Sequence, residues 1–291
     1  MKKSKIKDYN DTVEHDVISQ LLELVPVHSI YLLQISTDKN SQIINMPPTN
    51  KRSKIIKSYT LFVITYKSIS KNLGLLMDDL YNKTQQKYRV YLITMVLSTA
   101  IKELNYGSNF LLNILKRTPC IFKDSDNLDK FIGFGLLYHP NFYEHIHRVW
   151  KNRMERANYW ISMVYVDDCK EDEFVNLGML NYGLEQICVA LIYVFWEFNP
   201  SYYSLPYLMH LCSHFSDLPQ AYFLKSTYQR KRTFYLLCNA RNQMRFKAFQ
   251  EYSSHDSKKA YNLCEQFLQE ATTIGEKQLS KIKLLHYKGK R

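Results

Sequence analysis

The chain has 291 residues, of which 46% are hydrophobic and 23% are charged. This composition excludes a disordered chain, and the length allows one large domain or two ordinary domains, each with its own core. Only eight glycines and eight prolines occur, which argues against an all-β protein with many tight turns.

The formal net charge of +12 is concentrated at the two ends of the chain. Residues 1–7 contribute +4 and residues 276–291 contribute +5, so nine of the twelve charges lie there. Basic tails attract any polyanion without specificity. We therefore expect any binding of a nucleotide or RNA to be weak and driven by these tails. The alternative is that the basic ends only keep the chain soluble.

Nothing in the sequence predicts a secretory signal or a membrane span. The basic start MKKSKIK is followed by the polar segment DYNDTVEHD, where a signal would need apolar residues. The most apolar run, Ile187 to Trp196, is shorter than the roughly 20 residues that a membrane span requires. Six cysteines occur without a C-x-x-C pair, as is typical of reduced core thiols. We predict a cytoplasmic protein.

The first half of the chain alternates between helical and strand-like segments. Three runs rich in Ile, Val, Leu and Tyr predict strands covered on both faces, and the segments around them predict helices and one long loop. The predicted strands are Ser29–Ser36, Ser58–Tyr66 and Arg89–Ser98; the predicted helices are Thr12–Val25, Leu73–Gln86 and Thr99–Leu115; the loop is Thr37–Lys57.

The second half carries apolar residues at spacings of three and four, as expected for helices with one buried face. Four long stripes predict an up-and-down helical bundle, with a shorter helix from Pro206 to Phe215. The stripes begin near Ile146, Leu177, Leu237 and Ala260. We predict a two-domain α+β protein: a small α/β domain at residues 1–125, a linker at 126–140 and a helical bundle at 141–291.

Three segments of the second half carry a resemblance to a known family. They are Asn176–Trp196, Tyr207–Phe223 and Tyr235-LLCNAR-Arg241. They resemble the second helix, the third helix and the end of the fourth helix of the HEPN domain, a bundle found in RNA-cutting toxins and in partners of minimal nucleotidyltransferases. The preceding α/β half resembles the nucleotidyltransferase domain of fused proteins of this type from Bacteroidetes. The resemblance implies a possible homodimer through the bundle.

The nucleotidyltransferase resemblance implies residues that this sequence lacks. Such enzymes need a Gly-Ser turn after the first strand and carboxylates on neighbouring strands, because two divalent cations must be held by hard oxygen ligands. Here the first strand ends in LLQIS, where only Ser36 matches the turn, and no acidic residue lies between Asp38 and Asp78. We therefore expect a degenerate domain with neither catalytic residues, a metal nor a cofactor.

The HEPN resemblance implies an arginine followed at short spacing by a histidine, which would cut RNA. Arg241-Asn242 matches the start of that motif, but the next histidine is His255, fourteen positions on. Arg241, Asn242, Arg245 and Lys247 are the candidate ligand-binding residues. The alternative is that they form only the solvated face of a helix. His145 and His147, beside Glu144, are two positions apart on a helix, so their rings point apart and cannot share a metal. His210 and His214 have no Asp or Glu between them. We predict no metal at either pair.

These observations favour a non-catalytic binding or regulatory protein with a nucleotide or RNA as its ligand. Because binding would depend on the tails, replacing Arg241 should change it little. The competing hypothesis is an enzyme, a toxin-like HEPN ribonuclease with a non-standard active site around Arg241. A purely structural interaction module is the third possibility.

Overall fold

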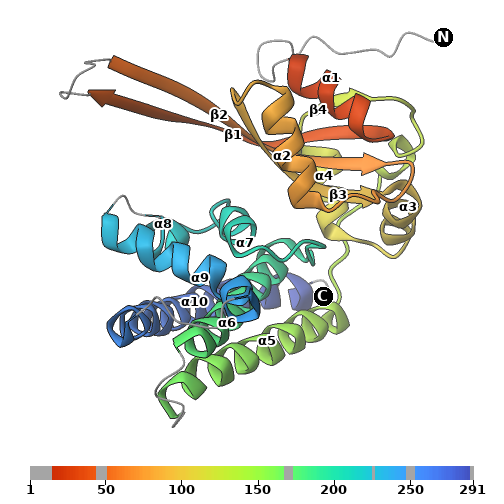
Figure 1. Cartoon of the computed structure of the whole chain (residues 1–291). Helices are drawn as coiled ribbons and strands as arrows, with labels where there is room; N and C mark the ends of the chain where they lie inside the picture. The colour runs from red at the N-terminus through yellow and green to blue at the C-terminus, as the bar shows by residue number, and fades with distance from the viewer. Residues whose placement is uncertain (1–14, 44–50, 167–172, 225–226, 247–252, 289–291) are drawn as a thin grey trace. The chain divides into compact units, whose positions relative to one another are not determined.

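A computed structural model describes residues 15–43, 51–166, 173–224, 227–246 and 253–288, with the backbone alone described for 38–43, 51–55 and 165–166. The chain divides into two compact units, Met1–Leu137 and Tyr138–Arg291 (Figure 1). The division at residue 137 falls within the segment 126–140 that was predicted to be a linker. The predicted α+β layout, with a sheet in the first half and helices in the second, is confirmed.

The first unit is built on a four-stranded sheet in the order β3-β2-β1-β4. Strands β2 and β3 are parallel, whereas β1 pairs antiparallel with both β2 and β4. The strands are β1 (Val27–Ile43), β2 (Lys51–Thr65), β3 (Tyr88–Val96) and β4 (Cys120–Lys123). The sheet is therefore mixed rather than all-parallel.

Helices cover both faces of this sheet, which explains why its strands are apolar at consecutive positions. Leu61 points into a core shared with α1 and α2, and the next residue, Phe62, stacks edge-on against Phe110 of α4 at 5.5 Å. The helices of this unit are α1 (His15–Leu24), α2 (Leu73–Lys83), α3 (Leu97–Asn105), α4 (Asn109–Arg117) and the short η1 (Asp129–Phe131).

Two sequence predictions for this unit need correction, and one strand was missed. The predicted helix Thr99–Leu115 is two helices, because Gly107 adopts φ +85° and Ser108 caps the second one by accepting a hydrogen bond from the Leu111 amide. The described parts of the predicted loop Thr37–Lys57 instead continue β1 and β2 as a paired ribbon. The short strand β4 was not predicted, because its four residues carry too little pattern.

The second unit is helical, and α6 is its central element. Helix α6 packs against α5, α7, α9 and α10 and buries most of its side chains. Its high apolar content on every side is typical of a helix surrounded by others. The helices are α5 (Pro140–Val166), α6 (Glu173–Trp196), α7 (Leu205–Cys212), α8 (Leu218–Tyr222), α9 (Tyr228–Phe246) and α10 (Ser254–Lys288).

With 24 residues, α6 is longer than the apolar run recognised in the sequence. It is the one described helix that is long and apolar enough to cross a membrane, but 78% of its most apolar window is buried inside the protein. A membrane helix would place that surface against lipid, whereas α6 places it against its neighbouring helices. The burial supports the sequence prediction of a core helix.

The buried face of α10 agrees with the predicted stripe at Ala260, Phe267 and Ala271 and differs from it at two positions. Cys264 and Gly275 are buried, while the neighbouring Leu263 and Ile274, assigned to the stripe from sequence, are only partly buried. Cysteine and glycine were passed over because apolarity, rather than small size, defined the stripe. Small residues at these positions let other helices approach α10 closely.

Candidate ligand-binding site

Arg241, the candidate residue chosen from the sequence, lies on α9 and forms an ion pair with Glu185 of α6. The Arg241 Nη1 atom donates to Glu185 Oε1 over 2.7 Å. The Glu185 side chain is only 7% exposed, whereas that of Arg241 is 42% exposed. The pair therefore has a buried acidic end and an open basic end, and an arginine has further N–H donors to offer a ligand.

Burial raises the pKa of the Glu185 carboxyl, and the adjacent Arg241 guanidinium opposes that rise. The carboxylate is thus held in an environment that disfavours its charge, with a single cation to compensate. This arrangement fixes the position of Arg241, because leaving the glutamate unpaired would cost free energy.

Aromatic rings extend the site outward from Arg241. The guanidinium carbon lies 4.3 Å from the centroid of the Tyr182 ring, within the range of a cation–π contact. Tyr182 stacks on Trp160 at 5.7 Å and 29°, and Trp160 contacts Tyr159 edge-on at 5.7 Å. Tyr159 is 57% exposed and Trp160 is 36% exposed. We refer to Tyr159, Trp160, Tyr182 and Arg241 as the aromatic array.

The array draws its residues from three helices: α5, α6 and α9. Gly183 lets α5 approach α6 closely, since a Cβ atom on it would lie 2.7 Å from a side-chain carbon of Ile161. One turn before Glu185, Asn181 donates to the main-chain carbonyl of Leu237 over 2.9 Å. Asn181 and Glu185 thus hold two successive turns of α9 against α6, so the array rests on packed helices rather than on a loop.

The other predicted site residues lie further along the chain from Arg241. Asn242 and Arg245 are exposed on α9, and the Arg245 guanidinium lies 5.4 Å from the Phe246 ring centroid. Lys247 lies outside the described residues. The structure therefore brings together Arg241, Glu185 and three aromatic residues, of which sequence reasoning found only the arginine. The available signal for Glu185 was an acidic residue in the interior of the apolar helix α6, whose other acid, Glu173, is its first residue.

The paired histidines lie in separate packing environments. His147 stacks on Tyr143, while His145 lies 3.1 Å from the Arg148 guanidinium. His210 and His214 meet edge-on at 5.5 Å, and burial lowers the pKa of His214 to about 4. Within the described ranges, no group of three or more His, Cys, Asp or Glu side chains could hold a metal ion.

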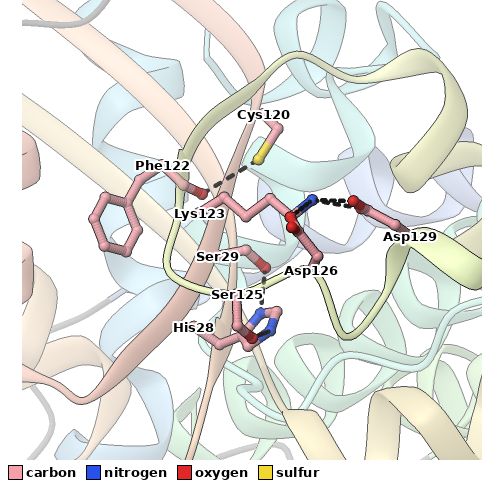
Figure 2. A network of polar contacts seen from close by, with 8 residues as sticks. All are labelled: His28, Ser29, Cys120, Phe122, Lys123, Ser125, Asp126 and Asp129. Carbon is pink, nitrogen blue, oxygen red and sulfur yellow. Dashed lines mark hydrogen bonds and ion pairs between the residues drawn. The ribbon is translucent and has the colours of Figure 1, made fainter. Parts of the chain in front are cut away.

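A second polar cluster lies in the first unit, where β1 meets β4 and the segment that follows it (Figure 2). His28 is completely buried, with Nδ1 3.0 Å from the Ser29 hydroxyl and Nε2 2.9 Å from the Ser125 hydroxyl. Lys123 forms ion pairs with Asp126 at 2.6 Å and with Asp129 at 2.5 Å.

This cluster stabilises the fold. Burial lowers the pKa of His28, which favours the neutral imidazole, and both ring nitrogens already have hydroxyl partners. Tyr66 packs edge-on against His28 at 5.4 Å and donates to Asp124 over 2.5 Å. The contacts fasten the segment after β4 to the sheet. Sequence reasoning missed them because their partners lie up to 97 positions apart.

No protein-family model, curated protein or solved structure matches this chain. The resemblances to the HEPN domain and to nucleotidyltransferases therefore stay predictions from the sequence, and the functional argument depends on the site itself.

Proposed function

We propose that the helical unit binds a nucleotide or single-stranded RNA at the aromatic array and does not turn it over. The observation that carries the proposal is the continuous array from exposed Tyr159 through Trp160 and Tyr182 to Arg241, anchored by buried Glu185. An exposed indole and a fixed guanidinium that both contact the Tyr182 ring suit a base and its phosphate: the base stacks, and the phosphate accepts hydrogen bonds from the arginine.

In this proposal the two halves keep the ancestry that the sequence resembles, a degenerate nucleotidyltransferase domain and a HEPN-like bundle. The first half contributes no catalysis, because Asp38 is the only acidic position on β1, β2 and β3 and two-metal chemistry needs several carboxylates. A homodimer through the helical bundle also belongs to the proposal. Light scattering at several protein concentrations measures it directly.

The array changes what we expect of Arg241. The basic tails still supply a weak, non-specific attraction that falls steeply with salt. Stacking on Trp160 is far less sensitive to salt, so at moderate salt the array should account for most of the remaining affinity. Replacing Arg241 should therefore weaken binding measurably under those conditions.

The test is fluorescence anisotropy with a labelled ten-nucleotide RNA at moderate salt, supported by quenching of tryptophan fluorescence. Because stacking contributes roughly 1–3 kcal/mol per base, Trp160→Ala should weaken binding by about tenfold or more. Arg241→Ala should weaken it by a smaller factor. Tyr106→Ala and Arg117→Ala, an exposed tyrosine and an exposed arginine of the first unit, are the matched controls and should bind like the wild type.

Equal binding by the wild type and Trp160→Ala would refute the proposal. The same RNA also tests the competing ribonuclease function, if it is incubated without added metal and its length is then analysed. Cleavage that Arg241→Ala abolishes would move the protein to the ribonuclease class. We expect the RNA to stay intact, since the Glu185 carboxylate that pairs with Arg241 is only 7% exposed.

A further inference from the structure

Strands β1 and β2 extend far beyond the rest of their sheet (Figure 1). Pairing between β2 and β3 begins at Lys57, and β4 pairs with β1 only from Ser29 to Tyr31. Beyond Lys57, β1 and β2 pair with each other through six further residue pairs, from Asp38 with Ile56 to Ile43 with Lys51. We call residues 38–43 and 51–56 the ribbon.

The ribbon has two strands and, within the described part of the chain, no strand at either edge. A two-stranded hairpin gains little from burial and is marginally stable by itself in water. Unpaired edges also invite association with other chains, and proteins usually keep such edges short. At about 3.3 Å per residue the six pairs extend roughly 20 Å. We therefore infer that the ribbon binds another molecule.

The charge of the ribbon indicates the class of partner. It carries four cations, Lys39, Lys51, Arg52 and Lys54, against one acid, Asp38. All four lie beyond the Thr37–Lys57 pair, where the pairing of β2 with β3 ends. A second copy of the ribbon would bring four more cations to the same place, so repulsion opposes pairing between two copies. A long polyanion matches both the positive charge and the length of the ribbon.

We propose that the ribbon inserts into a groove of double-stranded DNA. The major groove of B-form DNA is about 12 Å wide and admits a two-stranded β-ribbon. The major groove of an RNA duplex is too deep and narrow for this, and a single strand has no groove. The ribbon, with four cations and one acid, then lies between two phosphate backbones. This DNA-binding surface is separate from the aromatic array in the helical unit.

The experiment compares the affinity of the full-length protein for a 24-base-pair DNA duplex with that for a single strand of the same length. We expect the protein with an unchanged ribbon to prefer the duplex. In the ribbon variant, Lys39, Lys51, Arg52 and Lys54 are all replaced by Gln. This variant should lose at least tenfold in duplex affinity and most of the preference. The slope of log affinity against log salt should become shallower by about 3.6, because four phosphate contacts at roughly 0.9 each no longer release counterions.

A matched control removes four charges elsewhere by replacing Lys2, Lys3, Lys5 and Lys7 with Gln. Those charges belong to a tail, so this variant should lose affinity equally for duplex and single strand and keep the preference. A third variant, Lys39→Arg, Lys51→Arg and Lys54→Arg, keeps the charge and should keep the duplex affinity.

Three results of these comparisons would overturn the proposal: equal binding of duplex and single strand by the protein with an unchanged ribbon, an unchanged preference in the ribbon variant, or loss of binding in the arginine variant. A fourth is binding of an RNA duplex of the same length as tightly as the DNA duplex. In every protein of these comparisons Trp160 is also replaced by Ala, so that a single strand cannot stack at the aromatic array; this inference and the proposed function therefore fail separately.

Discussion

Gly275 of α10 lies directly against the indole ring of Trp150 on α5. A Cβ atom added to Gly275 would lie 2.0 Å from the ring carbon Cη2, far inside any real contact. Trp150 is 4% exposed, so the ring has no open space to move into. This close contact between the two longest helices of the second unit therefore depends on the absence of a side chain at position 275.

We predict that Gly275→Ala destabilises the second unit by about 2 kcal/mol. Overpacking of a core costs roughly 1–3 kcal/mol or more, and the higher helix propensity of alanine returns up to about 1 kcal/mol. Urea unfolding followed by tryptophan fluorescence measures it. All three tryptophans, Trp150, Trp160 and Trp196, lie in this unit and report on it selectively.

The control for this prediction is Gly178→Ala on α6. Its added Cβ would lie 3.4 Å from the sulfur of Met244, a flexible side chain that is 44% exposed and can move aside. Gly178→Ala should therefore be neutral or slightly stabilising. If both variants unfold at the same urea concentration, the inference that Trp150 leaves no room for a Cβ atom at position 275 is wrong.

Acid should destabilise the second unit through His214. Its pKa is lowered to about 4 by burial, and Trp196 packs edge-on against it at 5.3 Å. Between pH 6.5 and about 4 the unfolded chain binds a proton at this position and the folded chain does not. The free energy of unfolding must therefore fall as the pH falls through this window, by at most about 3 kcal/mol.

Replacing His214 with Phe should remove this part of the pH dependence, because no group is left to titrate at that position. His145→Gln is the control, since His145 is exposed on α5. Urea unfolding at pH 7, 6, 5 and 4.5 gives the comparison. Parallel curves for the wild type and His214→Phe would contradict the assignment.

Arg232 of α9 and Asp256 of α10 form a two-point ion pair, with Nε to Oδ1 at 3.1 Å and Nη2 to Oδ2 at 2.9 Å. Hydrogen bonds from Arg232 are the main cause of an Asp256 pKa lowered to about 2. The stabilisation is therefore present above pH 4 and is lost as the pH falls towards 2. We predict that Asp256→Asn costs about 1 kcal/mol at pH 7, since the pair is partly screened by solvent.

Glu155→Gln is the matched control for Asp256→Asn. Glu155 and Lys151 are 3.8 Å apart on α5, and both side chains are nearly two-thirds exposed. Exposed pairs of this kind contribute little to stability, so this variant should unfold at the same urea concentration as the wild type. An equal loss in both variants would point to a general charge effect.

The sequence was sufficient for the layout but not for the site. Leu61 and Phe62 lie in one apolar run, and that run correctly predicted a strand covered on both faces. The pairing of Arg241 with Glu185 joins residues 56 positions apart on two helices, and no local pattern specifies it. Trp160 was assigned to no site, because an aromatic residue in an amphipathic helix is more often part of the core.

For the ribbon, the sequence predicted the wrong secondary structure. Its polar residues and the Pro47-Pro48 pair predicted a loop, because local propensity was the only available guide. In the structure its residue pairs continue the register of β1 and β2 from the sheet, where Leu61 and its neighbours are buried. A strand that begins in a buried sheet can thus extend into a sequence that would not form a strand alone.

The final prediction concerns the pH dependence of the Arg241→Ala variant. Removing the guanidinium leaves the Glu185 carboxylate buried without its cation, which raises its pKa further above the ordinary value. The folded state then binds a proton more readily than the unfolded chain, so its stability falls as the pH rises. We expect a loss of about 2 kcal/mol at pH 7, below the roughly 3–5 kcal/mol typical of fully buried pairs, because the Arg241 side chain is 42% exposed. The loss should shrink towards pH 5.

Adding Glu185→Gln to Arg241→Ala removes the titrating group and should abolish this dependence. Urea unfolding of the single and double variants between pH 5 and 7.5 measures both effects, and a loss that stays constant with pH would show that Glu185 is not the buried charge that Arg241 compensates.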